Sequence, residues 1–384
     1  MLKRFRMDKT HLGIATKSTI RRAMSFIKTT ELEPPYLLID RAKVKTKAHS
    51  IGRKIRNSKV FYAVKANGDI EILKMLNKMG LGFEIASEGE LESLASIGVE
   101  KERIITSNPV KSFRFLRRAA EYGVPYYAFD SKDEVRKLRD YVPGCNVYVR
   151  LCVPNEGSEW PLSKKFGVEL DQAEELLLYA RKKGLKPAGL TFHVGSQCTN
   201  LYNWNSALDK AKILWDRLAK EGIRLSILNI GGGYPIRYTK NVVDISAIDK
   251  NINTLIYEKF PKHTQVFIEP GRAVVGDAGV FVSQVIGRTE RGDEDWLHID
   301  VGVFHGLMES VGGIKYSYIV EGSKEIKKWT LAGPSCDSFD VIERDIELHV
   351  PDIGGRILIL STGAYTTAYA SEFNGFSIPR TILI

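Results

Sequence analysis

Long apolar runs are absent from this chain. No stretch reaches the 18 apolar residues of a membrane-spanning helix, and the amino terminus lacks the apolar core of a secretory signal peptide. With 43% hydrophobic and 27% charged residues, the composition is that of an ordinary soluble protein. These observations predict a cytoplasmic protein without a membrane partner.

Cysteine is scarce and follows no pattern. The chain has four cysteines, at Cys145, Cys152, Cys198 and Cys336. Their spacing fits neither a zinc motif nor the disulfide framework of a small secreted protein. We therefore expect free thiols in a reducing compartment and no metal site.

Nucleic-acid-binding motifs, internal repeats and low-complexity tracts are also missing. The net charge is +10, and part of this excess lies near the amino terminus. There the single acid Asp8 stands among Lys3, Arg4, Arg6, Lys9, Lys17, Arg21, Arg22 and Lys28. A solvated helix face explains these charges better than a transit peptide or a nucleic-acid patch, so we expect no nucleic-acid partner.

Predicted strands and helices alternate from Val60 onward. We expect strands at residues 60–64, 83–86, 103–106, 126–129, 146–153, 189–193, 225–230 and 265–269, with helical stretches between them. Eight such units in roughly 230 residues predict a (β/α)8 barrel, because a doubly wound sheet would more often show fewer strands. We place this barrel domain at residues 36–276.

The pattern changes after Gly276. Short β-rich runs follow at residues 280–286, 296–303, 315–320, 329–331 and 357–360, separated by Gly, Asp and Pro. Such runs predict a separate all-β domain at residues 277–384, a β-sandwich or β-barrel. The amino-terminal segment, residues 1–35, is expected to pack against it. The fold class is therefore α/β plus all-β.

Polar residues collect where the predicted barrel strands end. Lys65 closes a buried apolar strand, and a neutral amine in such a place can attack an aldehyde. The other strand ends carry Glu84, Asn108, Arg150, His193, Ser196, the glycines Gly231, Gly232 and Gly233, and the run Glu269-Pro-Gly271-Arg272. The carboxyl ends of barrel strands are where functional groups gather.

Each of these residues has a simpler explanation when it is taken alone. Lys65 could extend to solvent, His193 could be a satisfied core histidine, and the three glycines could form a flexible loop. Together, however, they describe an amine, a phosphate cradle, an arginine and a carboxylate. Those are the groups that pyridoxal phosphate requires.

Several motifs resemble one family. They are Phe61-Tyr-Ala-Val-Lys65-Ala-Asn, Glu159-Trp-Pro-Leu-Ser-Lys-Lys-Phe-Gly167, His193-Val-Gly-Ser, Gly231-Gly-Gly-Tyr-Pro, Glu269-Pro-Gly-Arg, Gly333-Pro-Ser-Cys336-Asp337, Gly363-Ala-Tyr365 and Phe373-Asn-Gly-Phe. In this order they resemble the ornithine decarboxylase branch of the fold-type III, alanine-racemase-like pyridoxal-phosphate decarboxylases, in its bacterial form. The resemblance runs from about Tyr36 to the carboxyl terminus.

The resemblance implies roles for individual residues. Lys65 would bind pyridoxal 5'-phosphate covalently, His193 would stack on its ring, and Glu269 would pair with its pyridine nitrogen. The other residues implied to bind the cofactor are Glu84, Arg150, Ser196, Gly232, Gly233, Gly271, Arg272 and Tyr365. The phosphate would be held by Ser196, Gly233, Gly271, Arg272 and Tyr365.

The resemblance also implies a homodimer with shared active sites. Cys336 and Asp337 would reach into the partner's site, where the cysteine returns a proton to the α-carbon and the aspartate binds the distal ammonium of the substrate. The remaining implied substrate contacts are Glu309, Tyr365 and Phe373. The implied reaction is decarboxylation of L-ornithine to putrescine, L-lysine to cadaverine, or both, in polyamine biosynthesis.

Two features leave the substrate open. Ornithine decarboxylases carry a further acid where this chain has Ser310-Val-Gly312-Gly313, so either Glu309 replaces it or the distal pocket is altered. Diaminopimelate decarboxylases have Cys-Glu-Ser-Gly where this chain has Cys336-Asp-Ser-Phe339, which disfavours a diaminopimelate-type substrate. A decarboxylase of another amine-bearing substrate, a non-catalytic regulatory homologue and an amino-acid racemase are the alternatives.

Overall fold

The structure is a computed structural model that describes residues 5–7, 17–160 and 165–384. It divides into two units. The barrel unit comprises Ala48–Pro235 and Val243–Gly271, and the β unit comprises Met1–Lys47, Ile236–Val242 and Arg272–Ile384. The basic residues Lys3, Arg4 and Lys9, and positions 161–164 of the Glu159–Gly167 motif, lie outside the described residues.

The barrel unit is built on an eight-stranded parallel sheet. In sheet order its strands are β5 (Ile104–Ile105), β4 (Gly82–Glu84), β3 (Ser58–Ala63), β12 (Gln265–Ile268), β11 (Ile227–Asn229), β9 (Lys186–Thr191), β7 (Asn146–Arg150) and β6 (Tyr126–Phe129). Thr106 joins the two ends, since its N–H donates to Tyr126 O at 3.1 Å and its carbonyl accepts from Ala128 N at 2.8 Å. The predicted (β/α)8 barrel is confirmed.

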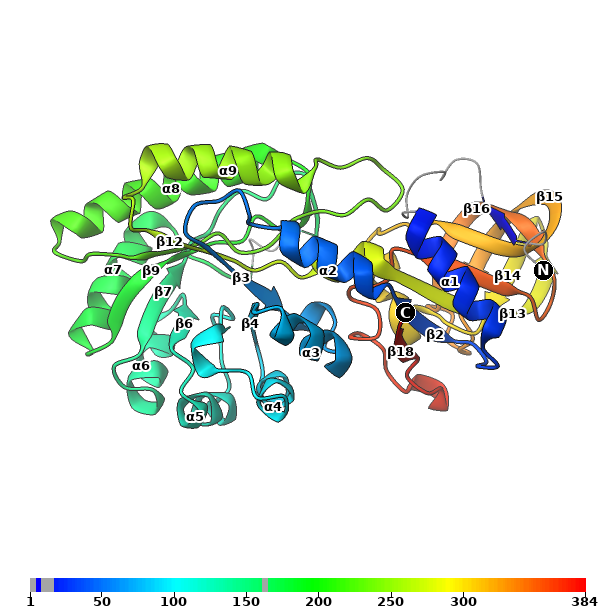
Figure 1. Ribbon diagram of the computed structural model, residues 1–384, viewed down its shortest axis with the longest axis horizontal. Helices are drawn as coiled ribbons and strands as arrows, with labels where there is room; N and C mark the ends of the chain where they lie inside the picture. Colours follow the sequence, from blue (N-terminus) through cyan, green and yellow to red (C-terminus); the bar gives the residue numbers. More distant parts are fainter. Residues whose placement is uncertain (1–4, 8–16, 161–164) are drawn as a thin grey trace. The chain divides into compact units, whose positions relative to one another are not determined.

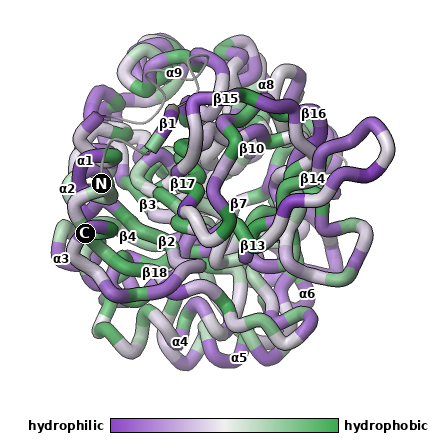
Figure 2. Tube along the Cα trace, turned by 90° about the vertical axis from the view of Figure 1, so that its right-hand side faces the viewer, coloured by the Kyte–Doolittle hydropathy of each residue, from purple (hydrophilic) through white to green (hydrophobic). Residues whose placement is uncertain are grey.

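Helices surround these strands (Figure 1). They are α3 (Ile70–Lys78), α4 (Glu88–Ser96), α5 (Phe113–Tyr122), α6 (Lys132–Tyr141), α7 (Leu170–Lys182), α8 (Leu201–Lys220) and α9 (Ile245–Lys259). Because helices cover the sheet, strands such as β4, β5 and β11 are buried along their whole length. Figure 2 shows that hydrophobic stretches are common along the strands and that hydrophilic residues are interspersed among them.

Local capping fixes where helices start after the strands. The carboxylate of Asp69 accepts from the N–H groups of Glu71 and Ile72 at the start of α3, as its position predicts. The Ser112 hydroxyl caps α5, which ends at Gly123 with a left-handed φ of 86°. Short caps keep the strand ends close to the helix starts, and the polar residues of the site lie at the last strand positions or on these connections.

The β unit is a mainly antiparallel sheet of eight strands. They are β1 (Phe5–Met7), β2 (Tyr36–Ile39), β13 (Gly279–Arg291), β14 (Glu294–Ile299), β15 (Tyr318–Ala332), β16 (Val341–Pro351), β17 (Arg356–Leu360) and β18 (Arg380–Leu383). The order is β1-β15-β14-β13-β2-β18, while β16 pairs with β15, and β17 pairs with β13 and β15. The predicted all-β domain is therefore present.

The amino-terminal segment belongs to the β unit. Ala23 and Ile27 of helix α1 (Lys17–Thr29) pack into a core with Leu38 of β2 and Val280 of β13. Strand β2 pairs with β13 and β18. The boundary drawn at residue 36 from the sequence thus differs from the observed one, because an apolar tetrapeptide does not reveal which sheet it joins.

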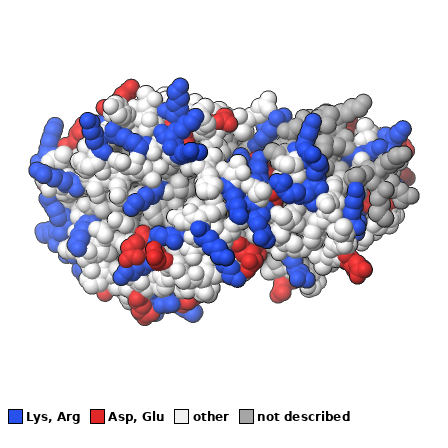
Figure 3. Space-filling model, in the orientation of Figure 1, with Lys and Arg blue, Asp and Glu red and all other residues white. Residues whose placement is uncertain are grey.

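Charged side chains are spread over the surface. Figure 3 shows lysine and arginine scattered over one face of both units, with acids among them. A mixed distribution of this kind is typical of a solvated surface. Among the described helices, none is both long and apolar enough to span a membrane.

Candidate active site

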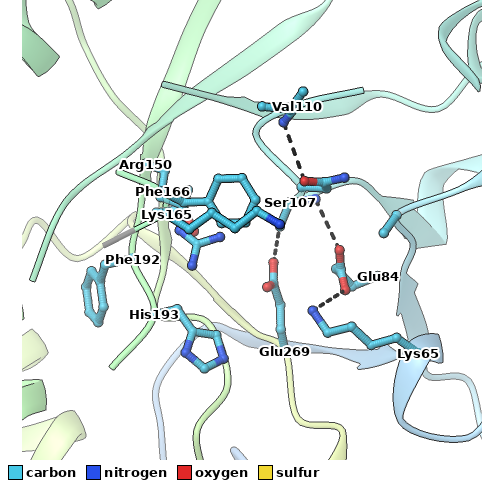
Figure 4. A pocket seen from close by; sticks show the side chains of 13 residues that line it. Lys65, Glu84, Ser107, Val110, Arg150, Lys165, Phe166, Phe192, His193 and Glu269 are labelled. Atoms are coloured by element: carbon cyan, nitrogen blue, oxygen red, sulfur yellow. Dashed lines mark hydrogen bonds and ion pairs between the residues drawn. The ribbon is translucent and has the colours of Figure 1, made fainter. Parts of the chain in front are cut away.

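The barrel unit contains a cavity of about 520 Å³ at the carboxyl ends of its strands (Figure 4). Its walls include five residues that the sequence singled out as cofactor-binding: Lys65, Glu84, Arg150, His193 and Glu269. Asn108, another predicted strand-end residue, also lines the cavity. Parallel strands bring their carboxyl ends to one edge, which explains why residues so distant in sequence meet here.

Lys65 lies in a short 3₁₀ turn, Val64–Ala66, directly after β3. Its Nζ is 3.8 Å from Oε2 of Glu84, and Figure 4 shows it pointing at that carboxylate. The Lys65 side chain is 52% exposed whereas that of Glu84 is 3% exposed. The amine therefore faces the open cavity and has a buried carboxylate at its side.

Glu90 is a second acid near Lys65 that the sequence did not assign to the site. The sequence predicts only a capping box, in which Ser87 caps α4 and Glu90 reaches back. The structure shows the cap, but the Glu90 carboxylate accepts from Ala86 N at 2.6 Å. Burial, followed by repulsion from Glu84, raises the pKa of Glu90 to about 7.

Glu269 is held by side chains from two other strand ends. Ser107 and Asn229 both donate to its Oε1, and Asn229 Nδ2 also lies 3.3 Å from Ser107 Oγ. The hydroxyl of Tyr148 lies 2.8 Å from Ser107 Oγ. Since both donors use Oε1, the carboxylate is fixed in orientation.

The surroundings of Glu269 favour its protonated form. Burial, followed by the charge of Glu84, raises the pKa of Glu269 to about 7. The hydrogen bonds from Asn229 and Ser107 act in the opposite direction. At neutral pH the carboxyl group is thus close to its midpoint and can share a proton with a nearby nitrogen.

His193 is neutral. Burial lowers the pKa of His193 well below its ordinary value, and the charges of Arg150 and Lys65 lower it further. Gly195 N donates to Nδ1 at 3.0 Å, which places the ring hydrogen on Nε2. A neutral imidazole with a fixed ring is suited to stacking on a flat, conjugated ligand.

Arg150 brings a half-buried cation to the same wall. Burial lowers its pKa, whereas the charges of Glu269, Asp130 and Glu84 counteract that effect. Its guanidinium carbon lies 5.2 Å from the centre of the Phe166 ring. An arginine stays charged even under burial, so it balances the acids of this wall.

The three glycines after β11 are required by close packing. A Cβ at Gly232 would lie 2.5 Å from the carbonyl oxygen of Glu269, and one at Gly233 would lie 2.5 Å from that of Gly195. Gly233 also has a left-handed φ of 92°. Its carbonyl accepts from Cys198 N in strand β10 (Ser196–Cys198), which brings Ser196 to the same strand end.

Arg272, Glu309 and Tyr365 belong to the β unit. The guanidinium of Arg272 forms a two-pronged ion pair with Glu309, with both N–O distances at 2.6 Å. It also lies 4.7 Å from the centre of the Tyr365 ring. Both oxygens of the buried Glu309 are engaged, so this geometry gives its predicted role toward a substrate ammonium no support.

Cys336, Asp337 and Phe373 are exposed on the β unit. Asp337 Oδ1 accepts from Phe339 N at 2.8 Å, which closes a tight turn within the loop. Phe373 opens the short helix η8 (Phe373–Gly375). Gly271 is the last residue of the barrel unit and directly precedes Arg272.

The residues that hold Glu269 were missed from the sequence. Ser107, Tyr148 and Asn229 lie on or just after β5, β7 and β11, so their place on strand ends was a usable signal. Their side chains, however, are ordinary in both type and context. Only the closed barrel reveals that Ser107 meets Glu269, 162 residues further along the chain.

Such a barrel end suits the chemistry of pyridoxal phosphate, because that cofactor needs an amine, a ring partner and a carboxyl group at its pyridine nitrogen. Residues 41–276 match the family described as pyridoxal-dependent decarboxylase, pyridoxal binding domain. The chain belongs to this family of pyridoxal-dependent decarboxylases.

Comparison with individual proteins gives the same result. The chain is 38% identical to a lysine/ornithine decarboxylase of Selenomonas ruminantium over 91% of its own length and 89% of the relative's. It resembles the crystal structure of lysine decarboxylase from that organism with a TM-score of 0.88, 35% identity and 97% of each chain covered.

A second solved relative is the lysine/ornithine decarboxylase of Vibrio vulnificus complexed with putrescine. It has a TM-score of 0.88 and 29% identity, with 97% of this chain and 99% of that chain covered. The same enzyme was also solved with cadaverine. The fold and the family predicted from the sequence are confirmed.

Proposed function

We propose that this protein uses pyridoxal 5'-phosphate to decarboxylate a basic L-amino acid. The substrate is L-ornithine, giving putrescine, L-lysine, giving cadaverine, or both, and the diamine feeds polyamine biosynthesis. The observation that carries this proposal is the meeting of Lys65, Glu84, His193 and Glu269 around one cavity. The similarity to lysine/ornithine decarboxylases supports it.

The residues at the barrel end fit the cofactor. The amine of Lys65 is open to the cavity, where it can bind an aldehyde. Neutral His193 is available for a ring, and the glycines after β11 let backbone N–H groups approach a phosphate. When bound, the cofactor supplies a sink for the electron pair that the departing CO2 leaves behind.

Glu269 controls a proton at the pyridine nitrogen in this proposal. Ser107 and Asn229 occupy Oε1, so Oε2 is the oxygen that we expect to face the ring. Because the carboxyl group titrates near neutrality, it can hold the shared proton on the nitrogen. A protonated ring withdraws more electron density, and loss of CO2 becomes easier.

We assign Ser196, Gly232, Gly233 and Gly271 to the phosphate together with Arg272 and Tyr365. For the substrate, Asp337 is the acid that would bind the distal ammonium, since an acid reads an ammonium and an arginine would read a second carboxylate. Phe373, Tyr365 and Glu309 complete the proposed substrate set.

We infer that the protein works in the cytoplasm as a homodimer whose subunits share active sites. Cys336 and Asp337 are exposed, and so are apolar side chains at residue 339 and within residues 373–378 of the same unit. These are Phe339, Phe373, Phe376 and Ile378. A second copy that covered this surface would remove apolar area from water and carry Cys336 to the partner's cavity.

Measuring CO2 release tests the function. The purified protein with pyridoxal phosphate is incubated separately with L-ornithine, L-lysine, L-arginine and meso-diaminopimelate, and Lys65→Ala serves as the blank. We expect release from ornithine or lysine that the blank abolishes. Release from diaminopimelate alone, or equal release from protein and blank, would overturn the assignment.

The ratio of the two rates reports the distal pocket. Ornithine and lysine differ by one methylene, worth only about 1–3 kcal/mol of discrimination. Glu309 is paired with Arg272, and this ratio tests whether it also replaces the acid missing at Gly312 and Gly313. A regulatory homologue without activity is the alternative, and retention of Lys65, Cys336 and Asp337 disfavours it.

A further inference from the structure

The amide of Asn374 is in contact with Cys336. Its Oδ1 accepts from the backbone N–H of Cys336 at 3.1 Å and from the thiol, with Oδ1 3.3 Å from Sγ. Two donors from one residue therefore converge on a single oxygen. This pairing also fixes the orientation of the amide, because its NH2 group cannot accept either bond.

Asn374 adopts a conformation that few residues tolerate. Its φ of 58° is left-handed, a region that favours glycine and, among other residues, asparagine. Gly375 follows with a φ of 78°. A backbone conformation of this kind costs free energy, and here it places the amide against the thiol.

Both sides of this contact are attached to one segment, Val303–Leu307. On the side of Cys336, the buried carboxylate of Asp340 accepts from Val303 N at 2.7 Å and from Ser335 N at 3.0 Å. The loop that carries Cys336 is therefore tied to Val303 by a residue that is 2% exposed.

The side of Asn374 is tied to the same segment by rings and backbone. The Phe304 and Phe373 rings lie 4.5 Å apart, and His305 Nε2 lies 3.2 Å from Phe373 O. Ser371 N donates to Phe304 O at 2.9 Å. Because the segments that carry Asn374 and Cys336 are both attached to Val303–Leu307, the amide and the thiol are already held close together. Little conformational entropy is therefore lost when they form their contact.

We propose that Asn374 is a positioning residue that holds the Cys336 thiol for proton delivery to the substrate α-carbon. This inference rests on the proposed decarboxylation. As CO2 leaves, the electron pair of the broken C–C bond stays on the substrate. The S–H bond of Cys336 breaks, a C–H bond forms at the α-carbon, and the thiolate takes a proton from solvent.

The carbon atom that receives the proton determines which product is released. With the cofactor bound, a proton that missed the α-carbon would lead, with the addition of one water, to release of an amino aldehyde instead of the diamine, and the amino nitrogen would stay with the cofactor. Asn374 keeps the sulfur in one rotamer and the proton on it, because the contact needs an S–H hydrogen. Its loss should therefore raise the share of the aldehyde product more than it lowers binding of the substrate.

Two substitutions of Asn374 distinguish the effect of its side-chain acceptor from the effect of its left-handed backbone conformation. Asn374→Gly removes the acceptor and tolerates the left-handed φ, whereas Asn374→Asp keeps an acceptor of the same length. Cys336→Ala provides the limit without a thiol. Equal melting temperatures of the two Asn374 variants and the wild type would show that folding is unaffected.

The first readout needs no cofactor. The rate at which iodoacetamide alkylates Cys336, followed at that peptide by mass spectrometry, should rise about 3- to 10-fold in Asn374→Gly, which is the factor of one ordinary hydrogen bond. Asn374→Asp should react no faster than the wild type. A wild-type rate in Asn374→Gly would overturn the proposal.

The second readout is the product ratio with pyridoxal phosphate and ornithine. We expect the ratio of 4-aminobutanal to putrescine to rise about 3- to 10-fold in Asn374→Gly and to stay near the wild-type value in Asn374→Asp. An unchanged ratio in Asn374→Gly refutes the role in proton delivery. If the wild type releases no CO2, the proposed function and this role both fail, while alkylation still decides whether Asn374 holds the thiol.

Discussion

A single carboxyl group, Glu269, shows how the barrel prepares a residue for its chemistry. Burial penalises its charge, whereas Ser107 and Asn229 stabilise the charge through hydrogen bonds. Burial is the larger effect, so its pKa rises from 4.5 to about 7. The protein thus accepts a cost in stability at neutral pH, and in the proposed function this acid is the partner of the cofactor's ring nitrogen.

This cost predicts a pH dependence of stability. Below pH 4.5 Glu269 is protonated in both the folded and the unfolded chain. As pH rises toward 7, the unfolded chain ionises first, so the folded state loses roughly 3 kcal/mol through this group. Glu269→Gln stays neutral and has no such loss. Without cofactor, the melting temperature of the wild type should therefore fall by several degrees relative to Glu269→Gln between pH 5 and 8.

Comparing the wild type with Glu269→Gln removes the effect of other acids that titrate in this pH range. Glu90, whose pKa is also raised to about 7, contributes equally to both and cancels. If the melting temperatures of the wild type and Glu269→Gln changed equally between pH 5 and 8, the pKa of Glu269 would not be raised in the folded protein.

At the level of residues, the sequence identified the groups that line the cavity but not their supports. Lys65, Glu84, His193 and Glu269 could be predicted because each sits at the end of a recognisable strand. Ser107 and Asn229 could not, because their meaning comes from a contact across the barrel. Likewise, the pairing of Glu309 with Arg272 depends on how the β unit folds.

Among the elements, the connection after β5 is supported by a buried lysine. Lys111 Nζ donates to Ala128 O and lies 3.0 Å from Asn108 O and 2.9 Å from Oε1 of Glu134. Its side chain is fully buried. Burial lowers the pKa of Lys111, while the charge of Glu134 opposes that effect. This lysine thereby fixes the connection that carries Ser107 to Glu269.

Replacing Lys111 by methionine should destabilise the protein. The change leaves Glu134 buried with Lys137 as its remaining ionic partner. The cost should therefore approach but not exceed the roughly 3–5 kcal/mol of a buried charge left without a partner. Lys132→Met is the matched control, because its pair with Glu175 is exposed and worth about 0–1 kcal/mol. Urea unfolding measures both, and equal midpoints for the two variants would contradict the role of Lys111.

The strands themselves could be predicted unequally. The barrel strands were found because each has a buried stretch that contains apolar residues on both faces. In the β unit, β15 is one long strand that overlaps two predicted runs, residues 315–320 and 329–331, and includes the exposed segment around Ser323 and Lys324 between them. Strand β16 was not predicted. Apolar and charged residues are mixed along it and only three of its eleven residues are buried, so no clear apolar pattern marks the strand and pairing with β15 determines its structure.

For the whole molecule, no sequence pattern indicates the division into two units that the structure has. Residues 36–47 and 236–242 belong to the β unit, although both stretches lie within the predicted barrel domain. Strand β2 joins the sheet of the β unit only because it pairs with β13 and β18. Pairing between distant segments is not encoded in either segment alone.

Mixing two inactive variants tests the shared active site of the proposed homodimer. Lys65→Ala lacks the amine of the barrel unit, and Cys336→Ala lacks the thiol of the β unit, so each alone should yield little diamine. If Cys336 serves the partner's cavity, a mixed dimer has one site with both groups intact. An equal mixture with free exchange of subunits should then recover about a quarter of wild-type diamine formation, because half of the dimers are mixed and each has one such site.

Lys65→Ala mixed with Lys65→Met is the control and should recover nothing. If the first mixture also recovers nothing, although exchange is demonstrated by mass spectrometry, Cys336 and Lys65 act within one subunit.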